Sequence, residues 1–140
     1  MNILYPAKII LQEEDHRFLI TFFDFDEAVT EAETIEEAFF NAEEVLTLTL
    51  EGRLDEGISI PAPSHKHGKN IYQIPPSARI QAALLVQLSR GNQTTAELAR
   101  ILETSWPAAA RLEDHHHWPS LRQLEKAANA MGKRLILSFE

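Results

Sequence analysis

The segment over residues 34–52 constrains the fold most, because it specifies one long helix with a single apolar stripe. The run T-I-E-E matches a capping box, in which the Thr34 hydroxyl and the Glu37 carboxylate satisfy free amides at the helix start. Apolar residues then recur at helical spacing until Gly52 offers a stop. The stripe comprises Ile35, Ala38, Phe39, Ala42, Val45, Leu46 and Thr49, and the acids placed toward water are Glu36, Glu43 and Glu44. Such a helix predicts a sheet on which the stripe packs.

Three strands are predicted before this helix. Residues 2–12 alternate in the manner of a strand, with Pro6 suited to a sheet edge. The turn EEDHR, residues 13–17, reverses the chain into a second β-rich run at 18–23. After an acidic bend, a shorter third strand is expected at 29–32.

A proline-rich connector divides the chain. Residues 58–60 are a short strand candidate ended by Pro61, and PAPSHKHGKN has the composition of an exposed connector. Residues 70–74 read as an isolated strand. The first domain, 1–64, is therefore expected to be a small α+β layer of order βββαβ, followed by a linker over 65–76.

Short capped helices dominate the second half, residues 77–140. Each expected helix has a hydroxyl at its start, and glycine follows the first and the last of them. The final run alternates like a strand. The expected caps are Ser77, Thr94, Thr104 or Ser105, and Ser120, the expected stops are Gly91 and Gly132, and the expected strand is 134–139. An all-α domain with a C-terminal strand is predicted.

Charge separates the two halves. Residues 1–69 carry 15 acidic and 5 basic side chains, a net charge of −10, whereas residues 70–140 carry 6 and 8, a net charge of +2. The first half is unfit for nucleic acid and the second is compatible with it. The chain has no cysteine and no apolar run near the ~20 residues that cross a bilayer, so a cytoplasmic protein without membrane partners is expected.

The stretch TTAELARILETSWPAAARLEDH resembles a helix-turn-helix of the λ-repressor-like, or Xre, class. Leu98 and Leu102 lie one turn apart on the first helix, and Ala109 and Leu112 lie three apart on the second. The small Ala99 allows a close helix crossing. In the turn, Glu103 stands where that class usually has glycine, which makes it a candidate for backbone strain.

Packing at those positions would leave one side of the second helix free to enter a major groove. Arg111 is the natural reader, because a guanidinium forks to guanine or clamps a phosphate, whereas alanine offers contacts only to thymine methyls. Hydroxyls at the helix starts would position phosphates. The expected DNA-binding residues are Thr95, Ser105, Trp106, Ala108, Arg111 and His115.

Both halves together resemble the HicB antitoxin family with an Xre-type DNA-binding domain. The resemblance rests on YPAKI, the strand ending in FFDFDEA, the segment TEAETIEEAFFNA, and IPAPS before the connector. It implies a partly degenerate ribonuclease-H-like N-terminal domain that covers a small basic toxin of the HicA type, which cleaves messenger RNA. The C-terminal domain would bind operator DNA as a homodimer or higher homo-oligomer.

The acidic bend supplies the expected toxin-binding residues on this interpretation. Acids with aromatic rings suit a basic protein surface that normally attracts RNA. The chain would act without catalysis and without a cofactor. The expected toxin-binding residues are Phe22, Phe23, Asp24, Phe25, Asp26 and Glu27.

Two alternatives remain open. One is a stand-alone transcription regulator whose acidic domain senses a protein or a small ligand. The other is a metal-dependent nuclease that uses Asp24 and Asp26, although the leading strand lacks the acid that a two-metal site needs. A zinc site in the histidine run 115–117 is disfavoured because adjacent side chains diverge. Trp118 is expected to close the domain core.

Overall fold

A computed structural model describes all residues, 1–140, and the chain divides into two compact units. Residues 1–80 form the N-terminal unit and residues 81–140 the C-terminal unit. The expected α+β fold is confirmed, since a four-stranded antiparallel sheet is followed by helices. No helix combines the length and apolar character that crossing a membrane would need.

The N-terminal unit is built on a sheet of order β3-β2-β1-β4. β1 (Tyr5–Leu11) pairs with β2 (Phe18–Phe22), and β2 pairs with β3 (Val29–Ala32), which confirms the three strands predicted before the helix. The turn between β1 and β2 is held by the amide of Gln12, which donates to the carbonyl of Arg17 at 2.8 Å. Two hairpins in succession therefore build three of the four strands.

The predicted edge position of Pro6 is wrong, because β1 lies inside the sheet. On one side Pro6 is opposite Gln73, and on the other its carbonyl accepts from the amide of Phe23 at 3.3 Å. The last residue pair between β1 and β2 is Ala7 with Phe22. Because the missing N–H of Pro6 lies beyond that pair, an interior strand tolerates the proline.

The fourth strand is also placed differently from the prediction. Residues 58–60 form no strand, whereas β4 (Ile71–Ile74) pairs with β1 and is therefore not isolated. The order βββαβ holds, but its last strand comes from the segment expected to be linker. β4, with the sequence IYQI, has three residues that favour strands, whereas the segment ISI is followed directly by a proline, which cannot donate to a sheet. Only one of the two segments can pair with the free side of β1.

α1 (Ile35–Asp55) begins as predicted and ends later. The Thr34 hydroxyl accepts from the amide of Glu37 at 3.1 Å, but the Glu37 carboxylate reaches the amide of Glu33, at 3.4 Å, so the expected reciprocal box is only half formed. The helix continues through Gly52 and stops before Gly57, which has φ of +73°. The predicted helix end at Gly52 is therefore wrong.

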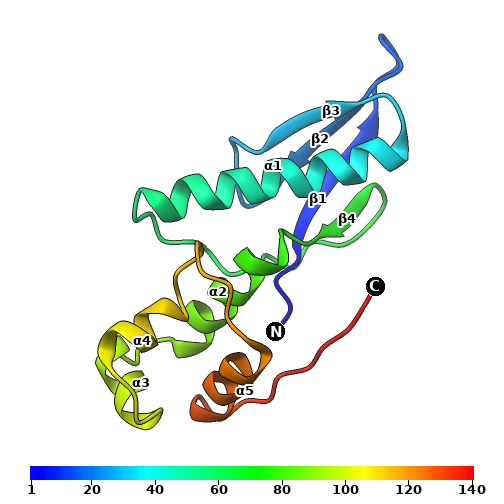
Figure 1. Ribbon diagram of the computed structural model, residues 1–140. Helices are drawn as coiled ribbons and strands as arrows, with labels where there is room; N and C mark the ends of the chain where they lie inside the picture. The colour runs from blue at the N-terminus through cyan, green and yellow to red at the C-terminus, as the bar shows by residue number, and fades with distance from the viewer. The chain divides into compact units, whose positions relative to one another are not determined.

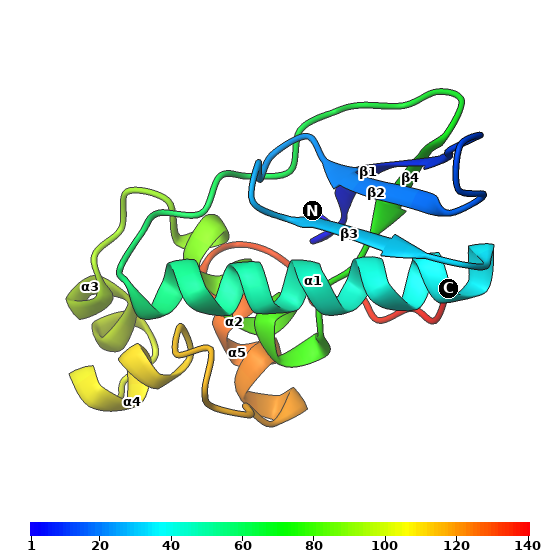
Figure 2. The same cartoon turned by 90° about the horizontal axis from the view of Figure 1, so that it is seen from above.

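α1 covers one face of the sheet, as both views show (Figure 1 and Figure 2). The Phe39 ring meets the Tyr72 ring edge-on at 5.0 Å between centroids, and the Asn41 side chain donates to the carbonyl of Glu31 at 2.9 Å. The predicted stripe is confirmed as the packed side, since its members Ala38, Ala42 and Leu46 are fully buried; Leu50, which was not predicted, is buried with them. Side chains of β1 and β2 that point to the same layer are Ala7, Ile9, Ile20 and Phe22.

Four helices follow β4 along the chain. They are α2 (Ala78–Arg90), α3 (Thr95–Ile101), α4 (Trp106–Arg111) and α5 (Leu121–Ala130). The predicted caps at Thr94, Ser105 and Ser120 are confirmed, because each side chain accepts from an amide three residues on. The core of the C-terminal unit is formed by Val86, Leu98, Leu112 and Ala127.

Two predictions for this unit are wrong. Residues 134–139 form no strand, because a strand needs a hydrogen-bonded partner and none lies beside them. Trp118 does not close the core, since its side chain is 68% exposed. Leu98 and Leu112, together with residues from α2 and α5, already fill that core.

Candidate functional site

The acidic bend, Phe22–Glu27, contributes two of its three aromatic side chains to the core and not to a surface. Phe22 and Phe25 are buried, and the Phe25 ring packs on the Tyr5 ring with 5.0 Å between centroids. The guanidinium carbon of Arg53 lies 4.9 Å from the centre of the Phe25 ring. Phe22 and Phe25, expected at a docking surface, are instead structural.

Asp24 in this bend ties two segments of the N-terminal unit together. One oxygen of its carboxylate accepts from the amide of Ser64 at 3.2 Å and from the Ser64 hydroxyl at 3.1 Å. Nearby, the Tyr5 hydroxyl donates to the carbonyl of Pro61 at 2.9 Å. Burial, with a smaller contribution from the charge of Asp24, raises the pKa of Tyr5, so this phenol remains a donor. The IPAPS segment is thereby anchored.

Glu27 forms a two-pronged ion pair with Arg53 of α1. The carboxylate oxygens lie 2.7 and 2.8 Å from the guanidinium nitrogens. The hydrogen bonds from Arg53, then a backbone hydrogen bond, lower the pKa of Glu27 to about 2. Arg53 also lies over Phe25, so one residue of the last helical turn holds the bend from two sides. These contacts explain why the helix continues past Gly52.

The Glu27–Arg53 pair predicts a pH dependence of stability. The folded-state pKa of Glu27 lies below its ordinary value of 4.5, so its contribution is present above that value and is lost as the pH falls toward 2. In thermal unfolding, wild type should melt above Glu27→Gln at pH 6, and the gap should close below about pH 4.5. Glu14→Gln, in the β1–β2 turn where no ion pair forms, should show no such gap. A gap that persists unchanged at pH 2 would contradict the assignment.

Phe23, Asp26 and Glu27 are the exposed members of the bend. The carboxylates of Asp24 and Glu27 are engaged with Ser64 and Arg53, so the acids of the bend point to different partners. Within neither unit taken alone do three potential ligand residues gather closely enough for a metal ion. The carboxylates of Asp24 and Glu27 therefore stabilise the turn by binding other segments of the N-terminal unit.

In the C-terminal unit, α3 and α4 are joined by a tight turn. Leu98 is buried, Leu102 packs against the same core, and Ala99 and Ala109 are buried, as the sequence predicts. The turn contains Glu103 with φ of +53°, a conformation that favours glycine. The Thr104 amide donates across it to the Ala99 carbonyl at 2.9 Å.

Relieving the backbone at Glu103 should stabilise the C-terminal unit. Glu103→Gly is expected to raise the free energy of unfolding by about 1 kcal/mol, because glycine adopts positive φ without a steric cost. Glu97→Gly, inside α3, should lower it by about the same amount. Chemical denaturation of both variants gives the comparison. Destabilisation by Glu103→Gly would show that the turn is not strained.

The structure places the expected DNA-binding residues unevenly. Trp106 is 57% exposed, Arg111 is exposed, and Ala108 is partly exposed, all on α4. The Ser105 hydroxyl caps α4 by accepting from the Ala108 amide at 3.2 Å. Thr95 Oγ1 donates to Glu113 at 3.4 Å. His115 is buried and stacks its ring at 4.0 Å from that of His116, so it is the least available of the six.

One group of residues was missed by the sequence prediction. Phe40 and Leu48, on the side of α1 opposite its buried stripe, are 65% and 60% exposed. Their eight-residue spacing repeats on one side of a helix and could have been found by tracing a second stripe. Contacts between residues far apart in sequence were also missed, such as the ion pair between Arg90 of α2 and Glu113 after α4, because no local pattern specifies them.

The chain thus consists of two compact units, one an acidic sheet covered by α1 and the other made of short capped helices. Comparison with protein families matches residues 4–83 to the HicB-like antitoxin of bacterial toxin–antitoxin systems. The chain belongs to the HicB-like antitoxin family. Membership supports an antitoxin role, which implies a toxin partner.

Individual relatives match over nearly the whole chain. Antitoxin HicB 2 of Photorhabdus laumondii is 30% identical over 136 residues, which are 97% of this chain and 96% of that protein. Antitoxin HicB of Escherichia coli (strain K12) is 30% identical over 134 residues, 95% of this chain and 96% of that protein. Antitoxin HicB 1 of Photorhabdus laumondii is 29% identical over 139 residues, 99% of this chain and 88% of that protein. The similarity therefore extends beyond the residues matched by the family model.

Proposed function

We propose that the N-terminal unit binds and inhibits a small basic HicA-type toxin, by covering it and without chemistry. The observation that carries this proposal is the net charge of −10 over residues 1–69, together with membership of an antitoxin family. Opposite charges speed association and align the partners, and apolar burial then holds the complex. The acids of the bend contribute mainly to the negative electrostatic potential of the unit, since two of its three carboxylates already bind Arg53 and Ser64 within the chain.

Co-expression tests this function directly. The neighbouring reading frame should encode a basic protein that stops growth when induced alone, and the full chain should restore growth and co-purify with it. Growth that is not restored, with the chain present and folded, would reject the proposal. A stand-alone regulator would give that result, with operator binding retained and no partner recovered.

We propose that α3, its turn and α4 form a helix-turn-helix that binds the operator of the chain's own operon. The exposed Arg111 and Trp106 on α4 and the net charge of +2 over residues 70–140 support this. Thr95 and Ser105 are at helix starts, where amides and hydroxyls commonly contact phosphates. Binding of promoter DNA measured in a gel shift tests it, and equal affinity for promoter and unrelated DNA would contradict it.

We propose a homodimer as the DNA-binding form. Residues 134–139 leave Ile136, Leu137 and Phe139 exposed with no strand beside them, and pairing with the same segment of a second copy would supply backbone partners. A palindromic operator requires two copies one DNA turn apart. Sedimentation of the chain should give twice the mass of 15.9 kDa, and removal of residues 134–139 should give a monomer. A monomeric full chain would contradict this.

A nuclease role has less support. The carboxylates of Asp24 and Glu27 hold Ser64 and Arg53, which leaves Asp26 as the acid of the bend without such a contact. Cleavage of RNA with magnesium that is lost on Asp26→Asn would nevertheless favour it.

A further inference from the structure

α1 has a second apolar side, which faces away from the sheet. Phe40 and Leu48 are the most exposed large apolar side chains of the N-terminal unit after Met1. A single exposed leucine is ordinary, but two large apolar groups on one side of a helix that also buries its opposite side are not. They lie eight residues apart, about 12 Å at 1.5 Å per residue.

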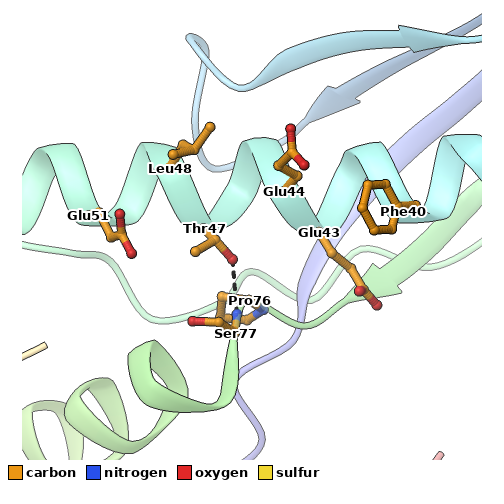
Figure 3. A pocket seen from close by; sticks show the side chains of 8 residues that line it. All are labelled: Phe40, Glu43, Glu44, Thr47, Leu48, Glu51, Pro76 and Ser77. Atoms are coloured by element: carbon orange, nitrogen blue, oxygen red, sulfur yellow. Dashed lines mark hydrogen bonds between the residues drawn. The ribbon is translucent and has the colours of Figure 1, made fainter. Parts of the chain in front are cut away.

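These two side chains belong to a groove, which we call the outer face of α1. It has a volume of 320 Å³, and Figure 3 shows Phe40 and Glu51 at opposite ends of the row of side chains. The Ser77 amide donates to the Thr47 hydroxyl at 2.9 Å, which holds the segment after β4 against the helix and forms one wall. The lining residues are Phe40, Glu43, Glu44, Thr47, Leu48, Glu51, Pro76 and Ser77.

The charge around this groove is negative and largely unneutralised. Glu43 and Glu44 lie between the two apolar side chains, are exposed, and pair with no cation, whereas Glu51 at the far end binds Arg79 at 2.8 Å. Two apolar anchors that flank unpaired carboxylates match a partner segment in which apolar side chains flank lysines or arginines.

The opposite surface of the unit lacks this combination. On the face of the sheet turned away from α1, Ile10 and Val29 are exposed, but Lys8 lies beside them and Glu31 of that face is bound by Arg17 at 3.1 Å. That face is apolar without a net acidic field, so a basic partner has less reason to bind there.

We infer that the outer face of α1 is the docking surface for the basic toxin, with Phe40 and Leu48 as its apolar anchors and Glu43 and Glu44 as the acids that meet the toxin's cations. This inference rests on the proposed function. It moves the expected contact away from the acidic bend, where Phe22 and Phe25 are buried, onto two turns of exposed helix. The partner is therefore a protein segment that is both basic and apolar, and is not nucleic acid.

The test measures the affinity of the full chain for an inactive variant of the toxin encoded beside it, by titration calorimetry. F40A/L48A should weaken binding at least about 100-fold, since two central anchors are removed. The matched control I10A/V29A removes two exposed apolar groups from the open sheet face and should stay within about threefold. E43K/E44K should weaken binding about tenfold and reduce its dependence on salt.

Each outcome separates the docking surface from the function. If the wild-type chain binds and F40A/L48A binds equally well, the surface is wrong and the antitoxin function stands. Loss of binding in I10A/V29A alone would move the interface to the sheet face and also overturn the inference. If F40A/L48A changes the sedimentation mass of the chain alone, the groove holds a second copy and not the toxin. If the wild-type chain does not bind the toxin, function and surface both fail.

Discussion

Replacing Leu46 by alanine is expected to lower the free energy of unfolding of the N-terminal unit by about 3 kcal/mol. Leu46 is fully buried on the side of α1 that packs on the sheet, and its truncation leaves a cavity that a two-layer unit cannot close. Because small domains have only about 5–15 kcal/mol of stability, this variant should stop inhibiting the toxin at a lower temperature than wild type does.

The same helix offers a matched control for this substitution. Leu48 lies two residues after Leu46, and Leu48→Ala removes the same atoms from a side chain that is 60% exposed. It should change the free energy of unfolding by no more than about 0.5 kcal/mol. Urea denaturation of both variants gives the comparison. Equal destabilisation would contradict the burial of Leu46 and the exposure of Leu48 on opposite sides of α1.

Arg111→Ala is expected to weaken operator binding about 10- to 100-fold, corresponding to the loss of about 1–3 kcal/mol from one guanidinium contact. Arg111 is exposed on α4 and makes no ion pair. If it reads a base, the loss should be confined to the cognate sequence; if it clamps a phosphate, binding to all sequences should fall and the salt slope should drop by about one.

Toxin affinity supplies the second readout for Arg111→Ala. The proposed division between the units requires that it stay within about threefold of wild type, because the change lies in the C-terminal unit. Arg122→Ala, on α5, is the matched control and should retain operator binding. If Arg122→Ala and Arg111→Ala lose operator affinity equally, α4 has no special role in DNA recognition.

Local patterns predicted most elements of this fold. The alternation in β1, β2 and β3, the hydroxyl caps at Thr34 and Ser105, and the apolar stripe of α1 each depend on residues close in sequence. The errors lie where distant contacts decide. β1 is interior because β4 pairs with it, and α1 passes Gly52 because Arg53 binds Glu27. No window of sequence contains both partners.

The candidate sites show the same limit. Composition located the acids and aromatics of the N-terminal half, but it did not distinguish Phe25, which packs on Tyr5, from Phe40, which faces water. Burial depends on which face a residue takes in the assembled sheet and helix. Glu103 was found because the resembled helix-turn-helix class usually has glycine at this turn position, and its φ of +53° is sterically unfavourable for any side chain.

The most direct test of the central claim is the affinity of the fragment of residues 1–80 for the toxin, measured beside that of the full chain. Residues 1–80 form a compact unit with its own sheet, helix and core. If an acidic module alone neutralises a basic toxin, the fragment should bind within about threefold of the full chain, and more tightly as salt is lowered. A fragment that is folded by circular dichroism and does not bind the toxin would contradict the account.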